Sequence, residues 1–391
     1  MTGNQPTSPA DLDHAVRTRY SEGAAKQVAE LCCPVQYDAS LLQVIPEEVL
    51  ARDYGCGDPS RHVRPGETVL DLGSGTGKIC FIASQLVGAE GRVLGVDVND
   101  DMLALARGAA PVVAERIGYD NVTFLKGRIE DLALDHAALD EWLSEHPVSN
   151  AAELAALEQR CGRLRSERPL VPDQSVDLVL SNCVLNLVHP ERKRALFDEI
   201  FRVLRVGGRA VISDIVCDED VPAHLAADPE LWSGCISGAL REDAFIDAFA
   251  RAGLEGMRIL ERSETPWRVV EGIEFRSLTV EAFRVESGAC LEQNQAVIYR
   301  GPWSSVSDDD GHTLRRGQRM AVCGRTFAKL TGAPYAGEIV GVEPALAVDP
   351  ARAQPFACTG DRVRPASETK AGVLPVSIND AESCCEPGTC C

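Results

Sequence analysis

The sequence has little positive charge, no long apolar run and no recognisable leader. Its 391 residues include 39 Lys and Arg against 59 Asp and Glu, which gives a formal net charge of −20. This acidic excess argues against nucleic acid and anionic membrane surfaces as partners. No run of about 18 apolar residues is present, so we predict no membrane span. Residues 1–13 lack the basic start and apolar core of a secretory signal, so we expect a cytoplasmic protein.

Zinc-finger spacing is also missing, although the chain contains 15 cysteines. No two close cysteine pairs are separated by a loop of finger length, which argues against the common structural zinc sites. Thiols stay reduced in the cytosol, where cysteines more often indicate metal binding or catalysis than a disulfide scaffold. The odd number of cysteines excludes complete pairing within one chain.

Strand-like and helix-like segments alternate from about residue 67 onwards. The predicted strands are 67–71, 92–97, 122–125, 176–180, 209–214, 257–262 and 274–285. The predicted helices are 11–31, 46–53, 78–87, 100–117, 190–204 and 241–252, with an inserted helical excursion at 132–169. Pro111 is expected to kink or break the helix that contains it. The alternation predicts an α/β fold with a doubly wound, mostly parallel, Rossmann-like sheet.

Composition divides the chain into four segments. A helical lead at 1–60, which carries Cys32, Cys33 and Cys56, would fold as a lid over the main domain at 61–285. Short apolar runs between Gly and Pro predict a small β-rich C-terminal domain at 286–345. Pro, Ala, Ser and Asp dominate 346–391, which we interpret as a flexible tail ending in cysteines.

A glycine-rich loop, Gly73-Ser74-Gly75-Thr76-Gly77, follows the first predicted strand. Ligands bind beyond the carboxyl ends of such strands, where glycines let the backbone approach closely. Asp97 ends the second strand, where a carboxylate can accept both ribose hydroxyls, and Glu130 follows the third, near the expected adenine edge. A nicotinamide dinucleotide would call for Gly-x-Gly-x-x-Gly. The present Gly-x-Gly-x-Gly, preceded by an acid, resembles the first motif of class I S-adenosylmethionine (SAM)-dependent methyltransferases.

This resemblance implies SAM as cofactor and a class I methyltransferase fold. The residues predicted to bind SAM lie in the glycine loop and at the following strand ends: Asp71, Gly73, Ser74, Gly75, Gly77, Asp97, Val98, Met102, Ile129, Glu130 and Asn182.

Two cysteines are expected at the same edge of the sheet as the glycine loop. Cys183 follows the fourth strand, and Cys235 lies in a Gly- and Ser-rich loop after the fifth. Thiols beside a methyl donor, with no candidate His or Tyr base in any motif, favour a soft acceptor. Trivalent arsenic is soft, keeps a lone pair and carries no proton, so its methylation needs no general base.

Several motifs together look like those of arsenite SAM methyltransferases. They are Asp-Leu-Gly-Ser-Gly-Thr-Gly (71–77), Tyr-Gly-Cys-Gly (54–57), Ser-Asn-Cys-Val-Leu-Asn-Leu (181–187), Gly-Cys-Ile-Ser-Gly-Ala (234–239) and Val-Cys-Gly-Arg-Thr (322–326). The likeness covers roughly residues 11–345. It implies that SAM methylates thiolate-bound arsenite or methylarsenite, as arsenic detoxification.

The resemblance also implies roles for individual cysteines. Cys183 and Cys235 would bind arsenic throughout, and Cys56 would join them for the first methylation. Cys32 or Cys33 would serve that first step with Cys56, and the two would form a disulfide during turnover. A thiol donor such as thioredoxin or glutathione would reduce that disulfide.

The remaining cysteines have weaker motifs around them. We interpret Cys80, Cys161, Cys217, Cys290 and Cys358 as packing or surface residues, and Cys323 need not be a ligand. The terminal Cys384, Cys385, Cys390 and Cys391 either capture arsenic near the site or form a cluster without catalytic duty.

Two other functions compete with arsenic methylation. A SAM methyltransferase for an organic small molecule would need a base or an aromatic pocket, and alkylation of its cysteines would not matter. A non-enzymatic metalloid sink or sensor would bind arsenite without SAM, and the intact glycine loop argues against it.

Overall fold

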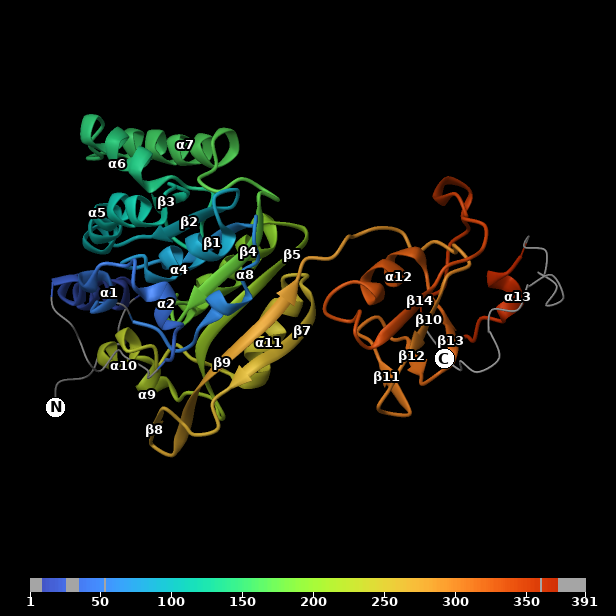
Figure 1. Ribbon diagram of the computed structural model, residues 1–391. Coiled ribbons are helices and arrows are strands. Elements are labelled where there is room, and N and C mark those ends of the chain that lie inside the picture. The colour runs from blue at the N-terminus through green and yellow to red at the C-terminus, as the bar shows by residue number, and fades with distance from the viewer. Residues whose placement is uncertain (1–8, 26–34, 53, 359–360, 372–391) are drawn as a thin grey trace. The chain divides into compact units, whose positions relative to one another are not determined.

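The computed structural model describes residues 9–25, 35–52, 54–358 and 361–371. Contacts divide the chain into two compact units, with the boundary between Val285 and Glu286 (Figure 1). The candidate residues Cys32 and Cys33 and the four terminal cysteines lie outside the described residues. Within the described ranges, no helix is both long and apolar enough to cross a membrane.

The helices of the first unit are α1 (Pro9–Ala25), α2 (Ala39–Leu42), α3 (Glu47–Leu50), η2 (Pro59–His62), α4 (Lys78–Val87), α5 (Asp100–Ile117), α6 (His136–Glu145), α7 (Ala151–Glu167), η3 (Leu185–Leu187), α8 (Pro190–Val203), α9 (Ala223–Ala226), α10 (Pro229–Ser233) and α11 (Glu242–Arg251). Its strands are β1 (Thr68–Leu72), β2 (Arg92–Asp97), β3 (Val122–Lys126), β4 (Val176–Asn182), β5 (Leu204–Cys217), β6 (Leu240–Arg241), β7 (Glu255–Arg262), β8 (Arg268–Val270) and β9 (Ile273–Phe283).

One sheet organises the first unit. Its strand order is β3-β2-β1-β4-β5-β9-β7, with β6 beside β5 and β8 beside β9. The strands from β3 to β5 pair in parallel, whereas β9 runs antiparallel to both of its neighbours, β5 and β7. The predicted doubly wound, mostly parallel sheet is therefore confirmed. The order reverses between β1 and β4, and a crevice at such a point is where α/β sheets bind ligands.

Helices cover both faces of this sheet. On one face α4 and α5 pack Phe81 and Leu103 against Val69 and Val93. On the other, aromatic residues of α8 and α11 pack against β5, with Phe197 and Phe249 edge to face at a 4.9 Å centroid separation. The central strands β1, β2 and β4 are therefore buried along most of their length.

Two details of the predicted helices were tested. Pro111 does not end its helix, because α5 runs unbroken from Asp100 to Ile117. Ala109 and Val113 on either side of the proline are buried in the core, and this packing offsets the backbone hydrogen bond that proline cannot make. The inserted excursion does form helices: α6 and α7 lie side by side, with Leu139 and Leu164 buried between them (Figure 1).

The C-terminal unit is small and built of short strands. Its elements are β10 (Ala296–Tyr299), β11 (Ser305–Ser307), β12 (Thr313–Arg315), β13 (Arg319–Ala321), α12 (Gly324–Thr331), β14 (Ile339–Val342), η4 (Pro350–Arg352) and α13 (Ala366–Thr369). The strands form an antiparallel sheet in the order β13-β10-β14 and a separate β11-β12 pair. This matches the predicted β-rich C-terminal part.

Part of the segment that the sequence predicts to be a flexible tail is folded onto this unit. Arg364 is 1% exposed and pairs with Glu292 at 2.6 Å and with Glu368 at 2.7 Å. The backbone N–H of Ala321 also donates to Arg362 at 2.8 Å. A composition rich in Pro and Ala suggested disorder, but one buried, doubly paired arginine anchors residues 361–371.

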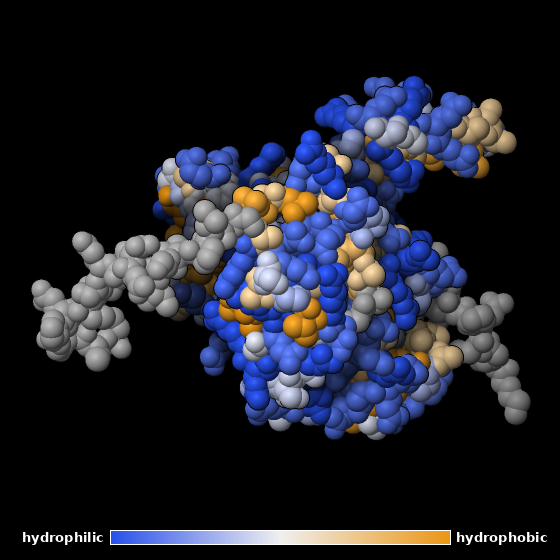
Figure 2. Space-filling model, turned by 90° about the vertical axis from the view of Figure 1, so that its right-hand side faces the viewer, coloured by the Kyte–Doolittle hydropathy of each residue, from blue (hydrophilic) through white to orange (hydrophobic). Residues whose placement is uncertain are grey.

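The surface is largely polar on the face that Figure 2 draws, with small separate hydrophobic patches. Large exposed apolar side chains occur singly, such as Trp303 at 68% and Leu346 at 63%. Scattered residues of this kind are normal on a protein surface and indicate no interface by themselves.

Candidate active site

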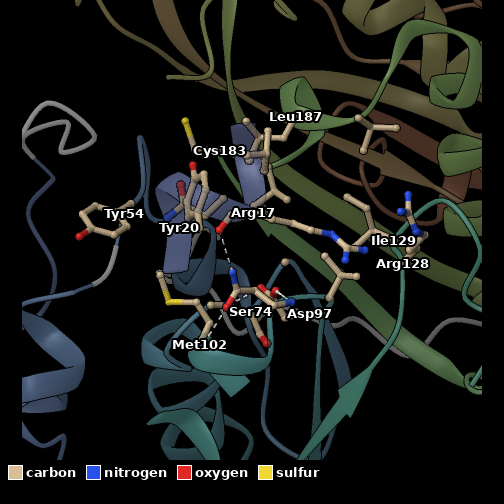
Figure 3. Close-up of a pocket in the computed structure, with 18 of the residues that line it drawn as sticks. Arg17, Tyr20, Tyr54, Ser74, Asp97, Met102, Arg128, Ile129, Cys183 and Leu187 are labelled. Carbon is tan, nitrogen blue, oxygen red and sulfur yellow. Dashed lines mark hydrogen bonds between the residues drawn. The ribbon is translucent and has the colours of Figure 1, made fainter. Parts of the chain in front are cut away.

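A cavity opens where the sheet order reverses, at the carboxyl ends of β1, β2 and β4. It encloses roughly 1170 Å³ of space, part of it open to solvent. In Figure 3, Ser74, Asp97 and Met102 lie on one side, Cys183 and Leu187 on the other. The predicted residues Asp71, Gly73, Ser74, Gly75, Asp97, Val98, Met102, Ile129, Glu130, Asn182 and Cys183 all line it. A cavity with polar groups at strand ends suits a small-molecule ligand.

The glycine loop takes a shape that other residues would not allow. Gly73 and Gly75 have φ values of +67° and +51°, in the left-handed region that favours glycine. A Cβ on Gly73 would collide with the Val184 side chain, whereas a Cβ on Gly75 would meet open space. Gly77 does not line the cavity; at φ +90° it is the N-cap of α4, packed against Phe124. The loop thus brings bare backbone to the cavity wall and starts α4 beneath it.

Asp97 holds this loop in place from the end of β2. Its carboxylate accepts hydrogen bonds from the N–H of Gly75 at 2.9 Å and of Asn99 at 2.8 Å. Burial raises the pKa of Asp97, and these backbone donors offset part of that effect. The Ser74 hydroxyl, by contrast, is buried and has no hydrogen-bond partner among the described residues. A buried orphan hydroxyl in a cavity wall is a group that a polar ligand would satisfy.

Helix α1 forms another wall of the cavity, contributing Asp13, Arg17 and Tyr20. The Asn99 amide donates to the Ser21 hydroxyl at 3.1 Å, which ties α1 to the start of α5. The Arg19 guanidinium donates to the Ser233 hydroxyl at 3.0 Å, which ties it to α10. Helix α1 is therefore held both to the start of α5, which borders the cavity, and to α10, which precedes Cys235.

A four-charge network closes the rim near the predicted adenine edge. Arg128 and Arg192 each contact both Asp13 and Glu130, at distances between 3.1 and 3.4 Å. The Glu130 carboxylate, predicted from sequence to face an adenine, is thus shared with two arginines. Because the same two arginines also bind Asp13 of α1, the network fixes the position of α1 as well as shaping a base pocket.

Two cysteines at this edge adopt a strained backbone conformation. Cys183, directly after β4, has φ +65°, and Cys235, after α10, has φ +62°. Non-glycine residues rarely occupy this left-handed region, which costs of order 1 kcal/mol or more, and such strain gathers at functional sites. The Cys235 thiol lies 3.1 Å from the Cys183 carbonyl oxygen and donates to it. We call Cys56, Cys183 and Cys235 the donor-side thiols.

Asn182 fixes the loop that carries Cys56. Its side-chain oxygen accepts from the N–H of Cys56 at 2.9 Å and of Gly57 at 3.2 Å, and its amide donates to the Gly57 carbonyl at 2.8 Å. A Cβ on Gly55 would collide with the Asn182 side chain, and one on Gly57 would come within 2.6 Å of the Ser213 hydroxyl. Asn182 lines the cavity as expected. These hydrogen bonds of its side chain go to the loop that carries Cys56 and position that loop.

Asn186 performs the matching task for Cys235. Its amide donates to the carbonyls of Cys235 at 3.2 Å and Ile215 at 2.6 Å. A Cβ on Gly238 would collide with the Asn186 carbonyl, so glycine permits this close approach. The Tyr20 hydroxyl of α1 lies 3.8 Å from the Cys235 sulfur. The two asparagines of the Ser-Asn-Cys-Val-Leu-Asn-Leu motif therefore hold the two loops on either side of Cys183.

The donor-side thiols converge. Atoms of Cys56, Cys183 and Asp214 that can act as ligands lie within 4.8 Å of one another. A hydrogen bond with Cys235 favours the Cys183 thiolate, but the Cys56 contact and burial outweigh it, so the pKa of Cys183 is raised well above its ordinary value. The contact with Cys183, together with burial, likewise raises the pKa of Cys235. The thiols of Cys183 and Cys235 are therefore neutral near pH 7.

A buried acid and a buried amine lie beneath the thiols. Burial raises the pKa of Asp214 to about 6, although the N–H groups of Ile215 and Leu185 donate to it. Burial lowers the pKa of Lys193 to about 8, and its amine donates to the Gly238 carbonyl at 2.5 Å. The donor-side thiols thus lie next to buried polar groups.

Sequence reasoning missed four residues of this site. Asp214 and Lys193 were not singled out, although Asp214 ends a predicted strand, which is the same signal that identified Asp71 and Asp97. Asn186 lies inside a quoted motif without having been given a role. Tyr20 had no signal, because nothing in a polar helix reveals which side chain faces a cavity.

Comparisons with known proteins agree with this geometry. A family model described as "Methyltransferase domain" matches residues 64–167 and 160–264, and one described as "Domain of unknown function" matches residues 286–373. The chain is 34% identical over 308 residues to the arsenite methyltransferase of Aquipseudomonas alcaligenes, covering 76% of this chain and 79% of that protein. It is 32% identical over 349 residues to that of Rattus norvegicus, covering 86% and 82%.

A solved structure is similar over most of the chain. It is that of an arsenic(III) S-adenosylmethionine methyltransferase from Chlamydomonas reinhardtii, at 28% identity and a TM-score of 0.54, with 83% of this chain and 99% of that chain covered. The cavity, the motifs around the donor-side thiols and these relatives agree, and the chain belongs to the arsenite methyltransferase family.

Proposed function

We propose that this chain transfers methyl groups from SAM to trivalent arsenic held by Cys56, Cys183 and Cys235. One observation carries the proposal: Cys183 lines the cavity formed by the glycine loop and also contacts the other two thiols. An acceptor bound to these sulfurs would therefore sit at the rim of the donor's cavity.

The residues of the cavity suit SAM. When bound, SAM supplies an electrophilic methyl group on a positively charged sulfur. Asp71 and Asp97, both at strand ends, offer carboxylates to its amino group and ribose hydroxyls, and the unpartnered Ser74 hydroxyl offers a further polar contact. Gly73 and Gly75 keep side chains out of the space that the ligand would fill.

The neutral thiols match a neutral acceptor. Near pH 7 arsenite is arsenous acid, and each Cys S–H replaces one As–OH to give an As–S bond and one water. This exchange changes neither the charge nor the oxidation state of arsenic. The raised pKa values of Cys183 and Cys235 therefore do not oppose binding, because the thiol protons leave in water.

The protein's contribution to the chemical step is position. Arsenic carries a lone pair and no proton, so no residue has to act as a base. The strained backbone at Cys183 and the amide contacts of Asn182 and Asn186 fix the direction from which the lone pair meets the methyl carbon. Such orientation is worth several kcal/mol of the barrier, and a misplacement of about 1 Å can cost about a hundredfold in rate.

Methylation leaves arsenic formally pentavalent, so a further round needs two electrons. We propose that two thiols supply them by forming a disulfide, with Cys56 and one of Cys32 or Cys33 as the pair. Thioredoxin or glutathione would then reduce the disulfide by thiol–disulfide exchange. Such donors are cytoplasmic, and we propose the same location for this protein.

The test uses the full-length chain with SAM, arsenite and either thioredoxin or glutathione. We expect methylated arsenicals, and we expect Cys235→Ser to abolish them while SAM binding is retained. Cys161→Ser is the matched control, because Cys161 is a half-buried cysteine of α7 outside the site. Normal product formation by Cys235→Ser would contradict the proposed acceptor site.

A further inference from the structure

Three further cysteines meet in the C-terminal unit. The sulfur atoms of Cys290, Cys323 and Cys358 all lie within 4.8 Å of one another. Cys290 and Cys358 were predicted to be packing or surface residues, because no supporting motif surrounds them. We call these three the C-terminal thiols.

Backbone hydrogen bonds hold the three segments that carry these thiols. The N–H of Phe356 donates to the Cys290 carbonyl at 2.8 Å, and the N–H of Gly324 donates to the Leu291 carbonyl at 3.0 Å. Leu291 also forms a β-bridge with Pro355. A Cβ on Gly324 would collide with the Gln293 side chain, so the glycine after Cys323 permits the close approach. The cluster is therefore built by the fold rather than by chance contact of mobile side chains.

The Cys323 thiol is also oriented. Cys323 is the N-cap of α12, and its sulfur accepts from the N–H of Thr326 at 3.3 Å and contacts the Thr326 hydroxyl at 3.2 Å. Backbone N–H donors at a helix start favour electron-rich sulfur. Cys323 is fully buried, whereas Cys290 and Cys358 are half-buried. A small ligand can therefore reach the cluster from solvent past the two half-buried sulfurs.

The donor set indicates the kind of ligand. Structural zinc sites take four nitrogen or sulfur ligands in a tetrahedron. Within the described part of the C-terminal unit, the ligand group around these thiols has three members, all sulfur. Three sulfurs suit a trivalent, thiophilic element that binds three ligands and keeps a lone pair.

We propose that Cys290, Cys323 and Cys358 form a second binding site for trivalent arsenic, separate from the methyl-transfer site. The assignment of arsenic rather than another thiophilic element rests on the proposed function of the first unit. Arsenous acid would exchange its three hydroxyls for the three thiols and release three waters, with no change of oxidation state. The residues that line the donor cavity all lie between Asp13 and His189, so none of the C-terminal thiols lines it, and we assign them binding rather than methylation.

The test measures arsenic bound to the full-length chain. The background carries Cys183→Ser, to remove the first site, and serine at the four terminal cysteines. After incubation with arsenite and a phosphine reductant, without SAM, we expect Cys358→Ser or Cys323→Ser to bind about one arsenic atom fewer per chain. Serine at 323 can still cap α12, so the fold is preserved. Cys161→Ser is the matched control and should bind as the background does.

X-ray absorption at the arsenic edge of the background protein should show three sulfur neighbours. Unchanged arsenic binding in both cluster variants would overturn the inference. Zinc that binds in a Cys358-dependent way and excludes arsenite would overturn it as well. Methylation by the wild-type chain is measured separately: product without Cys358-dependent binding defeats this inference alone, and Cys358-dependent binding without any product defeats the proposed function alone.

Discussion

The two thiol clusters are made of the same side chains on different backbones. The donor-side thiols include two residues at positive φ, Cys183 and Cys235, and depend on glycines that press loops against side chains. In the C-terminal cluster Cys323 has an ordinary φ of −73° and caps a helix. Strain accompanies the cluster that borders the donor cavity, where direction matters. The cluster proposed only to bind arsenic needs proximity alone.

The two units also differ in how a buried lysine is compensated. Below the donor-side thiols the buried Lys193 contacts a carbonyl and has a lowered pKa. In the C-terminal unit the buried Lys329 pairs directly with Asp310 at 2.8 Å. The first environment retains a poorly compensated buried charge, which is costly for stability and is typical of a functional site.

The largest expected effect separates the two clusters by activity. Cys183→Ser should reduce methylation more than about a hundredfold, because the acceptor loses the sulfur that lines the donor cavity. Cys323→Ser should leave the rate within about threefold, since its cluster only binds. Product speciation over time from arsenite and from methylarsenite measures both. An equal loss of methylation in Cys183→Ser and Cys323→Ser would contradict the assignment of methyl transfer to the donor-side thiols and of binding alone to the C-terminal thiols.

A pH experiment tests the buried amine. The folded-state pKa of Lys193 is about 8 against 10.5 for a free lysine, so the folded protein binds fewer protons than the unfolded chain between these values. Stability should therefore rise from pH 8 to 10.5, by up to about 3 kcal/mol relative to Lys193→Met. Denaturant unfolding of both proteins measures the difference. If the unfolding free energies of the wild-type chain and Lys193→Met changed with pH in parallel, the pKa of Lys193 would not be lowered in the folded protein.

The glycine loop offers a smaller, internally controlled effect. Gly73→Ala and Gly75→Ala both place a side chain at positive φ, at a cost of about 1 kcal/mol each. Gly73→Ala additionally collides with Val184, which should add about 1–3 kcal/mol and weaken SAM binding further. Calorimetric titration with SAM compares the two, and Val184→Ala should rescue only the first. The binding of arsenic to the C-terminal thiols should change in neither.

The smallest effect concerns the structural duty of Cys323. Cys323→Ala removes the acceptor for the Thr326 N–H and should lower the unfolding free energy of the C-terminal unit by about 0.5–2 kcal/mol. Cys323→Ser should lose less, although both variants lose arsenic binding. Thermal unfolding of the two proteins checks this. Equal unfolding free energies of Cys323→Ala and Cys323→Ser would show that the side chain at position 323 does not stabilise α12 as an N-cap.

Much of the first unit was predictable because its signals are local. Buried strands carry continuous apolar runs, and the acids at their ends, Asp71 and Asp97, mark the cavity edge. Asn186 and Lys193 were not found, because their partners, the carbonyls of Cys235 and Gly238, are more than 40 residues away in the chain. The predicted break of the helix at Pro111 was wrong for a similar reason. Burial of the residues on both sides of the proline outweighed the local rule that proline ends a helix.

By itself the sequence determined the fold class, the glycine loop and the family-like motifs around the donor-side thiols, since each depends on residues close together in the chain. Only the tertiary structure decided that Cys183 and Cys235 adopt positive φ and that the distant Asn186 amide holds the Cys235 carbonyl. It alone also brought Cys290, Cys323 and Cys358 together. Their separations in the chain have no periodicity to detect, and their proximity depends on backbone hydrogen bonds that exist only after folding.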